Sequence, residues 1–262
     1  MLDKERLTSH LRGEDEHKVA IEVLDGAELA WKTNRPQVTD FYDPHQQKVA
    51  ISVLSGIPEI TYFTFGGHRR CERARLVIVP QFFASDNIEP PITVLQVEGN
   101  FKFQKVSHKD FLGAMMGTGI KREKIGDIIQ IENGCQGVIA SEVEKYLLTN
   151  LVKVHQVPVK VKVIDPEQIE VEPERVKEIK TTVPAMRLDT IAASGFGTSR
   201  TKMVREIKAQ KVKVNWKEVP NPAFNIDQGD IISIRGRGRV IVDEVKGQTR
   251  KGRISIVLKR LI

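Results

Sequence analysis

The order of predicted elements between residues 91 and 165 is the feature that most limits the folds open to this chain. An apolar strand, ITVLQV, is followed by a helix that Ser107 can cap and by the strands DIIQI and GVIA. A second helix, capped near Ser141, and the alternating strand VPVKVKVI complete the segment. The order β-α-β-β-α-β is the signature of a split βαβ, ferredoxin-like fold. We therefore predict an α+β protein with a ferredoxin-like middle domain over residues 91–168.

The sequence before this domain has a helical period. From residue 2 to residue 34, apolar residues recur every three or four positions, and Gly13 interrupts them, so we expect two amphipathic helices. Thr39 or Asp43 can cap a third helix, and β-rich runs on both sides of the loop GGHRRCERAR predict a hairpin. Residues 1–90 are therefore expected to form an N-terminal domain of helices plus a hairpin.

The distribution of charge changes in the last third of the chain. The stretch DPEQIEVEPERVKEIKTTVP is charged, contains three prolines and has no stable period, so residues 169–182 are predicted to be a linker. Residues 181–262 contain 17 Lys and Arg against 7 Asp and Glu, whereas residues 1–180 contain 24 against 27. The net charge of +7 thus arises in the last third, and a segregated positive domain attracts polyanions.

Residues 183–262 are predicted to form two short helices beside a small curved sheet. Gly195 and Gly197 end the first helix, and Thr198 or Ser199 can cap the second, whose free N–H groups favour a phosphate. The predicted strands are KVKVN, DIISIRG, IVDEV and ISIVLKRL. The run SIRGRGRV joins two of them, either as a simple hairpin turn or as a basic loop that follows an RNA backbone.

Several motifs in this segment resemble the RNA-binding domain named after ribosomal protein S-four. They are R-L-D, S-G-F-G-T-S-R-T-K, I-K-A-Q-K-V-K-V-N and Q-G-D-I-I, in the family's order. The resemblance implies RNA-facing positions at Arg187, Ser199, Arg200, Lys202, Lys208, Lys211 and Lys213. To these we add neighbouring polar and basic residues: Thr201, Arg205, Asn215, Arg235, Arg237 and Arg239. The chain departs from the family at Lys211, where a glycine often precedes the strand.

Upstream motifs resemble a cyanobacterial and plastid family, the photosystem II S-four domain proteins, which is related to the bacterial YlmH proteins. The motifs are TDFYDPHQQKVAISVL, GGHRRCERAR and DFLGAMMGTGIKREKIGDI. This resemblance implies binding to structured rRNA or tRNA and association with the large ribosomal subunit and translation quality control. The family name also implies a link to photosynthetic assembly.

Two basic clusters lie outside the C-terminal segment. Arg69 and Arg70 occupy the loop GGHRRCERAR, which is either a solvated hairpin loop or a second RNA contact. Lys121, Arg122 and Lys124 follow a glycine-rich helix end, where cations are also favoured by the free carbonyls. We therefore leave both a structural role and RNA contact open for the second cluster.

We expect a non-catalytic RNA-binding protein, with no cofactor and no metal. The alternatives are an RNA-modifying enzyme such as a pseudouridine synthase, with Asp189 as its catalytic residue, and an assembly factor that acts through protein partners. Cys71 and Cys135 are far apart and have no metal-ligand spacing, so both are expected to be free thiols. A charged N-terminus and the lack of a long apolar run indicate a cytoplasmic protein. The sequence leaves the oligomeric state open.

Overall fold

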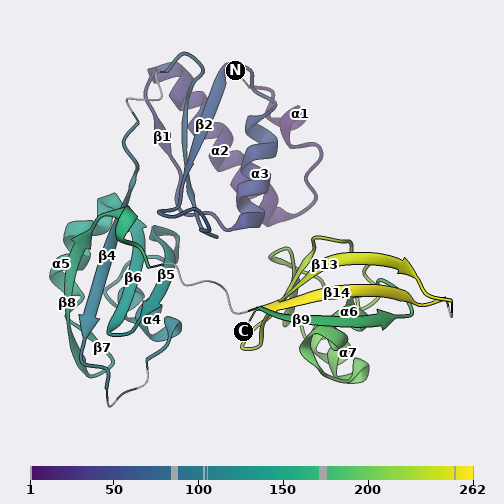
Figure 1. Cartoon of the computed structure of the whole chain (residues 1–262). Helices are drawn as coiled ribbons and strands as arrows, with labels where there is room; N and C mark the ends of the chain where they lie inside the picture. Colours follow the sequence, from purple (N-terminus) through teal and green to yellow (C-terminus); the bar gives the residue numbers. More distant parts are fainter. Residues whose placement is uncertain are drawn as a thin grey trace. The chain divides into compact units, whose positions relative to one another are not determined.

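The computed structural model contains two compact units, Met1–Val171 and Glu172–Ile262, which we call unit 1 and unit 2 (Figure 1). The structure describes residues 2–83, 88–102, 104, 106–170, 176–250 and 252–261. Each unit is described by itself. Within the described residues, no helix has both the length and the apolar character needed to cross a bilayer.

The N-terminal part of unit 1 packs three helices against a small sheet (Figure 1). The helices are α1 (Lys4–Thr8), α2 (Glu14–Thr33) and α3 (Pro44–Leu54), and the strands are β1 (Gln37–Val38), β2 (Ile60–Phe65) and β3 (Arg75–Pro80), in the order β1-β3-β2. Asp43 caps α3, because its carboxylate accepts hydrogen bonds from the N–H groups of His45 and Gln46, both at 2.9 Å. The predicted helices and hairpin are confirmed, and the two-residue strand β1 is an addition to them.

The second part of unit 1 is the ferredoxin-like fold that the sequence predicts. Its elements are β4 (Ile92–Gly99), α4 (His108–Gly117), β5 (Ile125–Ile131), β6 (Gly134–Ala140), α5 (Glu144–Asn150), β7 (Lys153–Val154) and β8 (Val157–Ile164). The sheet is antiparallel, in the order β5-β6-β4-β8-β7, so the first and third strands of the βαββαβ motif are central. Short 3-10 turns at Arg122–Lys124, Ser141–Val143 and Pro166–Gln168 complete this part.

Arg75 joins the two parts of unit 1. Its side chain is only 4% exposed, and its Nη1 and Nη2 donate to the two carboxylate oxygens of Glu142 at 2.7 and 2.9 Å. The same guanidinium donates to the carbonyls of Thr39 and Pro91, and Lys124 Nζ lies 2.8 Å from Glu142 Oε1. Burial alone would raise the pKa of Glu142, but the hydrogen bonds from Arg75 and Lys124 outweigh it and lower the pKa from 4.5 to about 2.

Replacing Glu142 by glutamine should therefore destabilise the chain at neutral pH, by an amount that shrinks in acid. A carboxyl group with a lowered pKa contributes stability above its ordinary value of 4.5 and loses it as the pH falls toward about 2. Thermal melts of wild type and Glu142→Gln across this range measure the effect. Glu132→Gln, an exposed change in the turn between β5 and β6, is the control. A melting-temperature difference that stays constant with pH would contradict this assignment.

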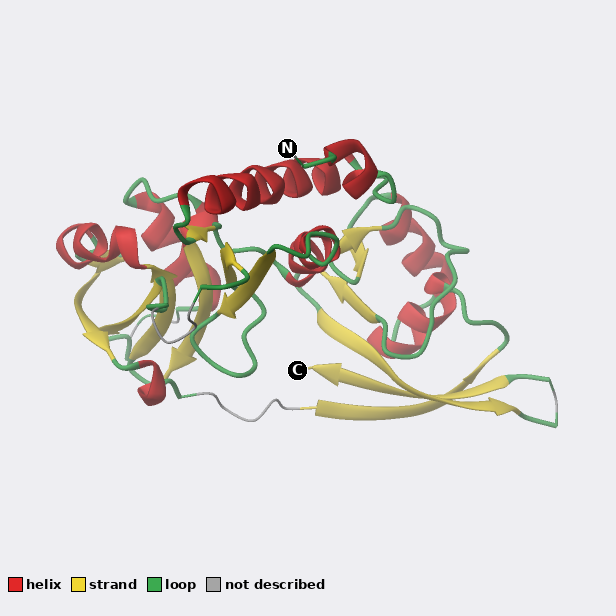
Figure 2. Cartoon of the chain, turned by 90° about the horizontal axis from the view of Figure 1, so that it is seen from above, coloured by secondary structure: helices red, strands yellow, loops and turns green. Residues whose placement is uncertain are grey.

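Unit 2 packs two helices against a six-stranded antiparallel sheet. The helices are α6 (Leu188–Phe196) and α7 (Arg200–Lys208), and the sheet order is β11 (Lys217–Glu218), β10 (Val212–Val214), β12 (Ile231–Ile234), β13 (Gly238–Gln248), β14 (Ile254–Leu261) and β9 (Val176–Val183). Buried apolar residues of both helices and of the sheet form one core. Figure 2 shows β13 and β14 as a long twisted ribbon, and two register shifts in their pairing account for added twist.

The predicted linker is wrong over its second half. Residues 176–183 form β9, which pairs with β14 in an unbroken register from Val176 opposite Leu261 to Val183 opposite Ile254. Only Ile179 and Val183 of this strand contribute apolar side chains to the core. The other residues are mostly charged or threonine, so the sequence does not show the alternation of apolar and polar residues that is typical of a strand. Residues 171–175 of the predicted linker lie outside the described part of the chain. A fragment that starts at residue 181 would therefore lack most of an edge strand.

Close packing of α6 on the sheet depends on Gly195. A Cβ atom at this position would lie 2.6 Å from Val240 Cγ1 on β13, which is too close for any real contact. Gly195→Ala should therefore lower the unfolding free energy by about 1–3 kcal/mol through overpacking. Gly113→Ala in α4 is the matched control, because a Cβ there meets nothing within 4 Å and should stabilise the helix by about 0.5–1 kcal/mol. If denaturant melts showed that both substitutions change the unfolding free energy in the same direction, the close approach of Gly195 to Val240 would be contradicted.

Candidate RNA-binding surface

Helix α7 begins at a side-chain cap. Ser199 Oγ accepts a hydrogen bond from the N–H of Lys202 at 3.3 Å, which confirms Ser199 as the capping residue. Arg200, Thr201 and Lys202 in the first turn are exposed. The N–H groups of Arg200 and Thr201 have no partner within the helix, so the positive end of the helix dipole carries two free donors and two flexible cations.

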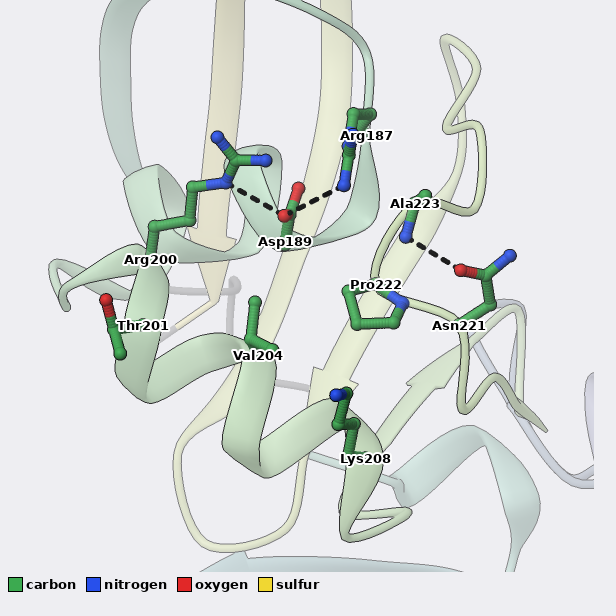
Figure 3. A pocket seen from close by; sticks show the side chains of 9 residues that line it. All are labelled: Arg187, Asp189, Arg200, Thr201, Val204, Lys208, Asn221, Pro222 and Ala223. Carbon is green, nitrogen blue, oxygen red and sulfur yellow. Dashed lines mark hydrogen bonds and ion pairs between the residues drawn. The ribbon is translucent and has the colours of Figure 1, made fainter.

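The carboxylate of Asp189 organises the start of both helices (Figure 3). Its side chain is 2% exposed, and its Oδ2 lies 2.8 Å from Arg200 Nε and 3.3 Å from Arg187 Nη2. Its other oxygen accepts a hydrogen bond from Thr190 Oγ1 at 3.0 Å. Burial by itself would raise the pKa of Asp189, but the hydrogen bonds from Arg200 and Thr190 and the charge of Arg187 hold it below its ordinary value. A carboxylate engaged in this way is an anchor for two arginines.

The two arginines border an open pocket of about 490 Å³ (Figure 3). Three segments line it, with Arg187 and Asp189 at the start of α6, Arg200, Thr201, Val204 and Lys208 on α7, and Asn221, Pro222 and Ala223 in the loop before β12. The Arg200 and Arg187 side chains are 53% and 40% exposed, and Arg187 Nε is buried without a hydrogen-bond partner among the described residues. The pocket therefore offers several donors and three cations to an anionic group.

The sequence did not predict that the loop before β12 forms one wall of this pocket. The N–H groups of Leu188 and Asp189 donate to the carbonyls of Phe224 and Pro222, so residues 221–226 cross the start of α6. The sequence NPAFN carries turn signals but nothing that indicates its tertiary partner. Val204 also lines the pocket, whereas Met203 and Ile207 of the same helix fill the core.

The predicted residues in the second half of α7 and just after it divide into exposed cations and one turn residue. Arg205, Lys208, Lys211 and Lys213 are exposed, and Lys213 Nζ lies 3.8 Å from Glu218. Asn215 instead holds the fold together, because its amide donates to Asp230 at 2.8 Å and accepts from the N–H of Ile231 at 3.0 Å. Its φ of 48°, with 68° at the next residue, suits the two-residue turn between β10 and β11.

The run Arg235-Gly236-Arg237-Gly238-Arg239 comprises the tight turn between β12 and β13 and the first two residues of β13. The N–H of Arg237 donates to the carbonyl of Ile234 at 2.9 Å, and both glycines have positive φ. Arg237 Nη2 lies 3.0 Å from Glu206 Oε1 on α7, and the Arg239 guanidinium lies 5.7 Å from the Trp216 ring centre. Arg235 is exposed. The turn thus presents cations while one of them ties it to α7.

The two basic clusters of unit 1 differ in their surroundings. Arg69 and Arg70 are exposed in the loop between β2 and β3, and Lys121 is exposed as well. Arg122 is half-buried, donates to the carbonyls of Ile125 and Gly126, and has its pKa lowered to about 10 by burial. Lys124 bridges Asp40 and Glu142 at 2.5 and 2.8 Å. The last two cations therefore have structural partners inside unit 1.

Comparisons with known proteins agree with this architecture. Three family models match in succession, described as "YlmH, N-terminal" at residues 15–82, "Putative RNA-binding domain in YlmH" at 87–168 and "S4 domain" at 186–232. Unit 2 therefore contains an S4 domain, and the helix pair with the Asp189 pocket lies within the matched segment.

One similar protein covers nearly the whole chain, and another covers part of unit 2. It is 31% identical over 251 residues to "Ribosome-associated protein quality control protein P2" of Bacillus subtilis, which covers 96% of this chain and 97% of that protein. It is also 31% identical over 70 residues to "Small ribosomal subunit protein uS4" of Desulfotalea psychrophila, covering 25% of this chain and 33% of that protein. The chain belongs to the YlmH family.

A solved structure has a similar fold. "Cell division protein ylmH from Streptococcus pneumoniae" matches with a TM-score of 0.51 and 21% identity, and the match covers 61% of this chain and 97% of that one. At this identity the likeness supports the fold alone.

Proposed function

We propose that this protein binds structured RNA through unit 2, with the Asp189 pocket and the exposed first turn of α7 holding phosphates of the RNA backbone. The observation that carries the proposal is the pocket itself, in which one buried carboxylate orients Arg187 and Arg200 beside Lys208. Arginine guanidiniums with free N–H groups bind phosphate oxygens in pairs. An S4 domain in this position and the name of the second similar protein support RNA as the polyanion.

The finer proposal is that the RNA is ribosomal or transfer RNA and that the protein associates with the large ribosomal subunit during translation quality control, in the cytoplasm. The name of the Bacillus relative, which covers almost the entire chain, supports ribosome association. The description of the middle domain's family model supports a second RNA contact in unit 1, for which Arg69, Arg70 and Lys121 are the exposed candidates. The alternative, a photosystem-linked assembly factor, rests only on the resemblance of the upstream motifs.

Binding to a labelled fragment of large-subunit rRNA should weaken steeply with salt, because each neutralised phosphate releases counterions. Arg200→Gln with Lys208→Gln should reduce affinity at least tenfold at low salt and lower the slope of log affinity against log salt by about 2. Fluorescence anisotropy of the full chain measures both values.

The matched control removes two cations elsewhere in unit 2. Lys180 and Lys246 are exposed on β9 and β13 and are already paired with Glu178 and Glu244, so replacing both by glutamine should change affinity little. Salt-independent or absent binding by the wild type would overturn the RNA proposal. If the two double variants lost RNA affinity equally, the proposal that the RNA binds at the pocket would be wrong.

The full-length protein should also sediment with the large ribosomal subunit in sucrose gradients at low salt and leave it at high salt. The Arg200→Gln/Lys208→Gln variant should stay near the top of the gradient, whereas the Lys180→Gln/Lys246→Gln variant should sediment as the wild type does. Nuclease treatment should release the wild type. Sedimentation with a nuclease-resistant protein complex would instead support the assembly-factor alternative.

A further inference from the structure

A second basic pocket, of about 500 Å³, lies at the end of the unit 2 sheet. It is lined by Lys177 on β9, by Gly236 and Arg237 in the turn after β12, by Gly238 at the start of β13, and by Arg260 and Leu261 on β14. Lys177 and Arg260 belong to strands outside the segment that matches the S4 family model, which ends at residue 232. This pocket is therefore not explained by the S4 domain itself.

Two of its cations face each other directly. Arg260 and Lys177 are register partners on the antiparallel strands β14 and β9, so they project from the same face of the sheet. Like charges in directly opposed positions destabilise a strand pair. Among the described residues, no carboxylate lies within ion-pair distance of either side chain. Arg260 lies over the Phe196 ring at 5.5 Å, and its Nη2 donates to the carbonyl of Arg237 at 3.5 Å. Repulsion between Lys177 and Arg260 consequently destabilises the protein without a ligand, and an anion bound between the two side chains would remove this repulsion.

The other face of the same strand pair is electrically balanced. Lys259, the neighbour of Arg260, is opposite Glu178 and lies 2.8 Å from Asp243, and Glu178 also pairs with Lys180 at 3.0 Å. The strand pair thus compensates charge on one face and opposes like charges on the other, which leaves the second face suited to an anionic ligand.

The turn after β12 completes the pocket and places it relative to α7. Gly238 has φ of 85°, and a Cβ there would lie 2.9 Å from the carbonyl oxygen of Leu261, so only glycine lets the turn approach the end of β14 this closely. Arg237 forms an ion pair with Glu206 on α7, and Val204 on the same helix lines the first pocket. These two α7 residues are two positions apart, so their side chains point about 200° apart around the helix axis. The two basic pockets are therefore on opposite sides of α7.

We propose that Lys177, Arg237 and Arg260 bind a second phosphate of the RNA that occupies the first pocket, so that the backbone contacts unit 2 on both sides of α7. This inference rests on the proposed function. The outward cations Lys202 and Arg205 lie on α7 between the two sites, and neither has a carboxylate partner among the described residues. A phosphodiester backbone is the anion that supplies charges at both positions in one molecule.

The test uses the full chain, a fluorescein-labelled RNA hairpin and a salt series. Lys177→Gln with Arg260→Gln should lower the slope of log affinity against log salt by about 0.7–0.9, the value for one lost phosphate contact. Lys177→Gln alone, an exposed change that leaves the Arg260–Phe196 stack in place, should weaken binding in the same direction. Without RNA, that single change should raise the melting temperature by about 1–5 °C, because it removes the opposed charge.

The controls separate this inference from the proposed function. Lys180→Gln removes one cation from the compensated face of β9 and should neither reduce the salt slope nor raise the melting temperature. If Arg200→Gln/Lys208→Gln weakens binding and Lys177→Gln/Arg260→Gln does not, the second pocket is overturned and the first remains. If the wild type does not bind the RNA, both the proposed function and the second pocket are wrong. If Lys177→Gln weakens binding of labelled polyglutamate and not of RNA, the ligand is an acidic peptide and the RNA inference is wrong.

Discussion

The buried carboxylate of Asp189 is the interaction on which the candidate surface depends. Burying a charge without partners is costly, and Asp189 is tolerated at 2% exposure because two guanidiniums and one hydroxyl surround it. The ion pairs in turn restrict Arg187 and Arg200, which would otherwise lose much side-chain entropy on meeting a ligand. The start of α6, the start of α7 and the loop 221–226 therefore form a preorganised site, since all three meet around this carboxylate.

The same carboxylate bears on the enzyme alternative that the Arg187-Leu188-Asp189 run suggested. A catalytic carboxylate must reach the reacting atoms of its substrate, whereas both oxygens of Asp189 already accept hydrogen bonds from side chains of unit 2. Its lowered pKa follows from those partners and needs no catalytic explanation. The families that match the chain are described by RNA binding or by YlmH, and none of these descriptions names a reaction.

Local patterns predicted most of the fold, and tertiary pairing accounts for what they missed. The βαββαβ order and the caps at Asp43 and Ser199 could be predicted, because hydrophobic period and capping chemistry act over a few residues. The charged sequence of β9 indicates a linker, whereas its pairing with β14, a contact between distant segments, makes it a strand. For the site, the cations of α7 were predicted, whereas the loop 221–226 and the pair Lys177 and Arg260 are defined by contacts between distant segments.

The structure also explains why a count of charges is a poor guide to a binding surface. In unit 1, Arg75 binds Glu142, Lys124 bridges Asp40 and Glu142, and Arg73 donates to the carbonyl of Ile125, so these three cations hold the two parts of the unit together. Arg122 donates to the carbonyls of Ile125 and Gly126 within the second part. In unit 2, the cations of α7 are exposed, and the carboxylate of Asp189 in the first pocket orients Arg200 of this helix together with Arg187 at the start of α6. A cation already hydrogen-bonded within the protein must break those contacts before it binds a phosphate, whereas an exposed or preoriented one need not. The partner of each cation, more than the local charge, therefore distinguishes the candidate surface of unit 2 from the structural cations of unit 1, which are Arg73, Arg75, Arg122 and Lys124.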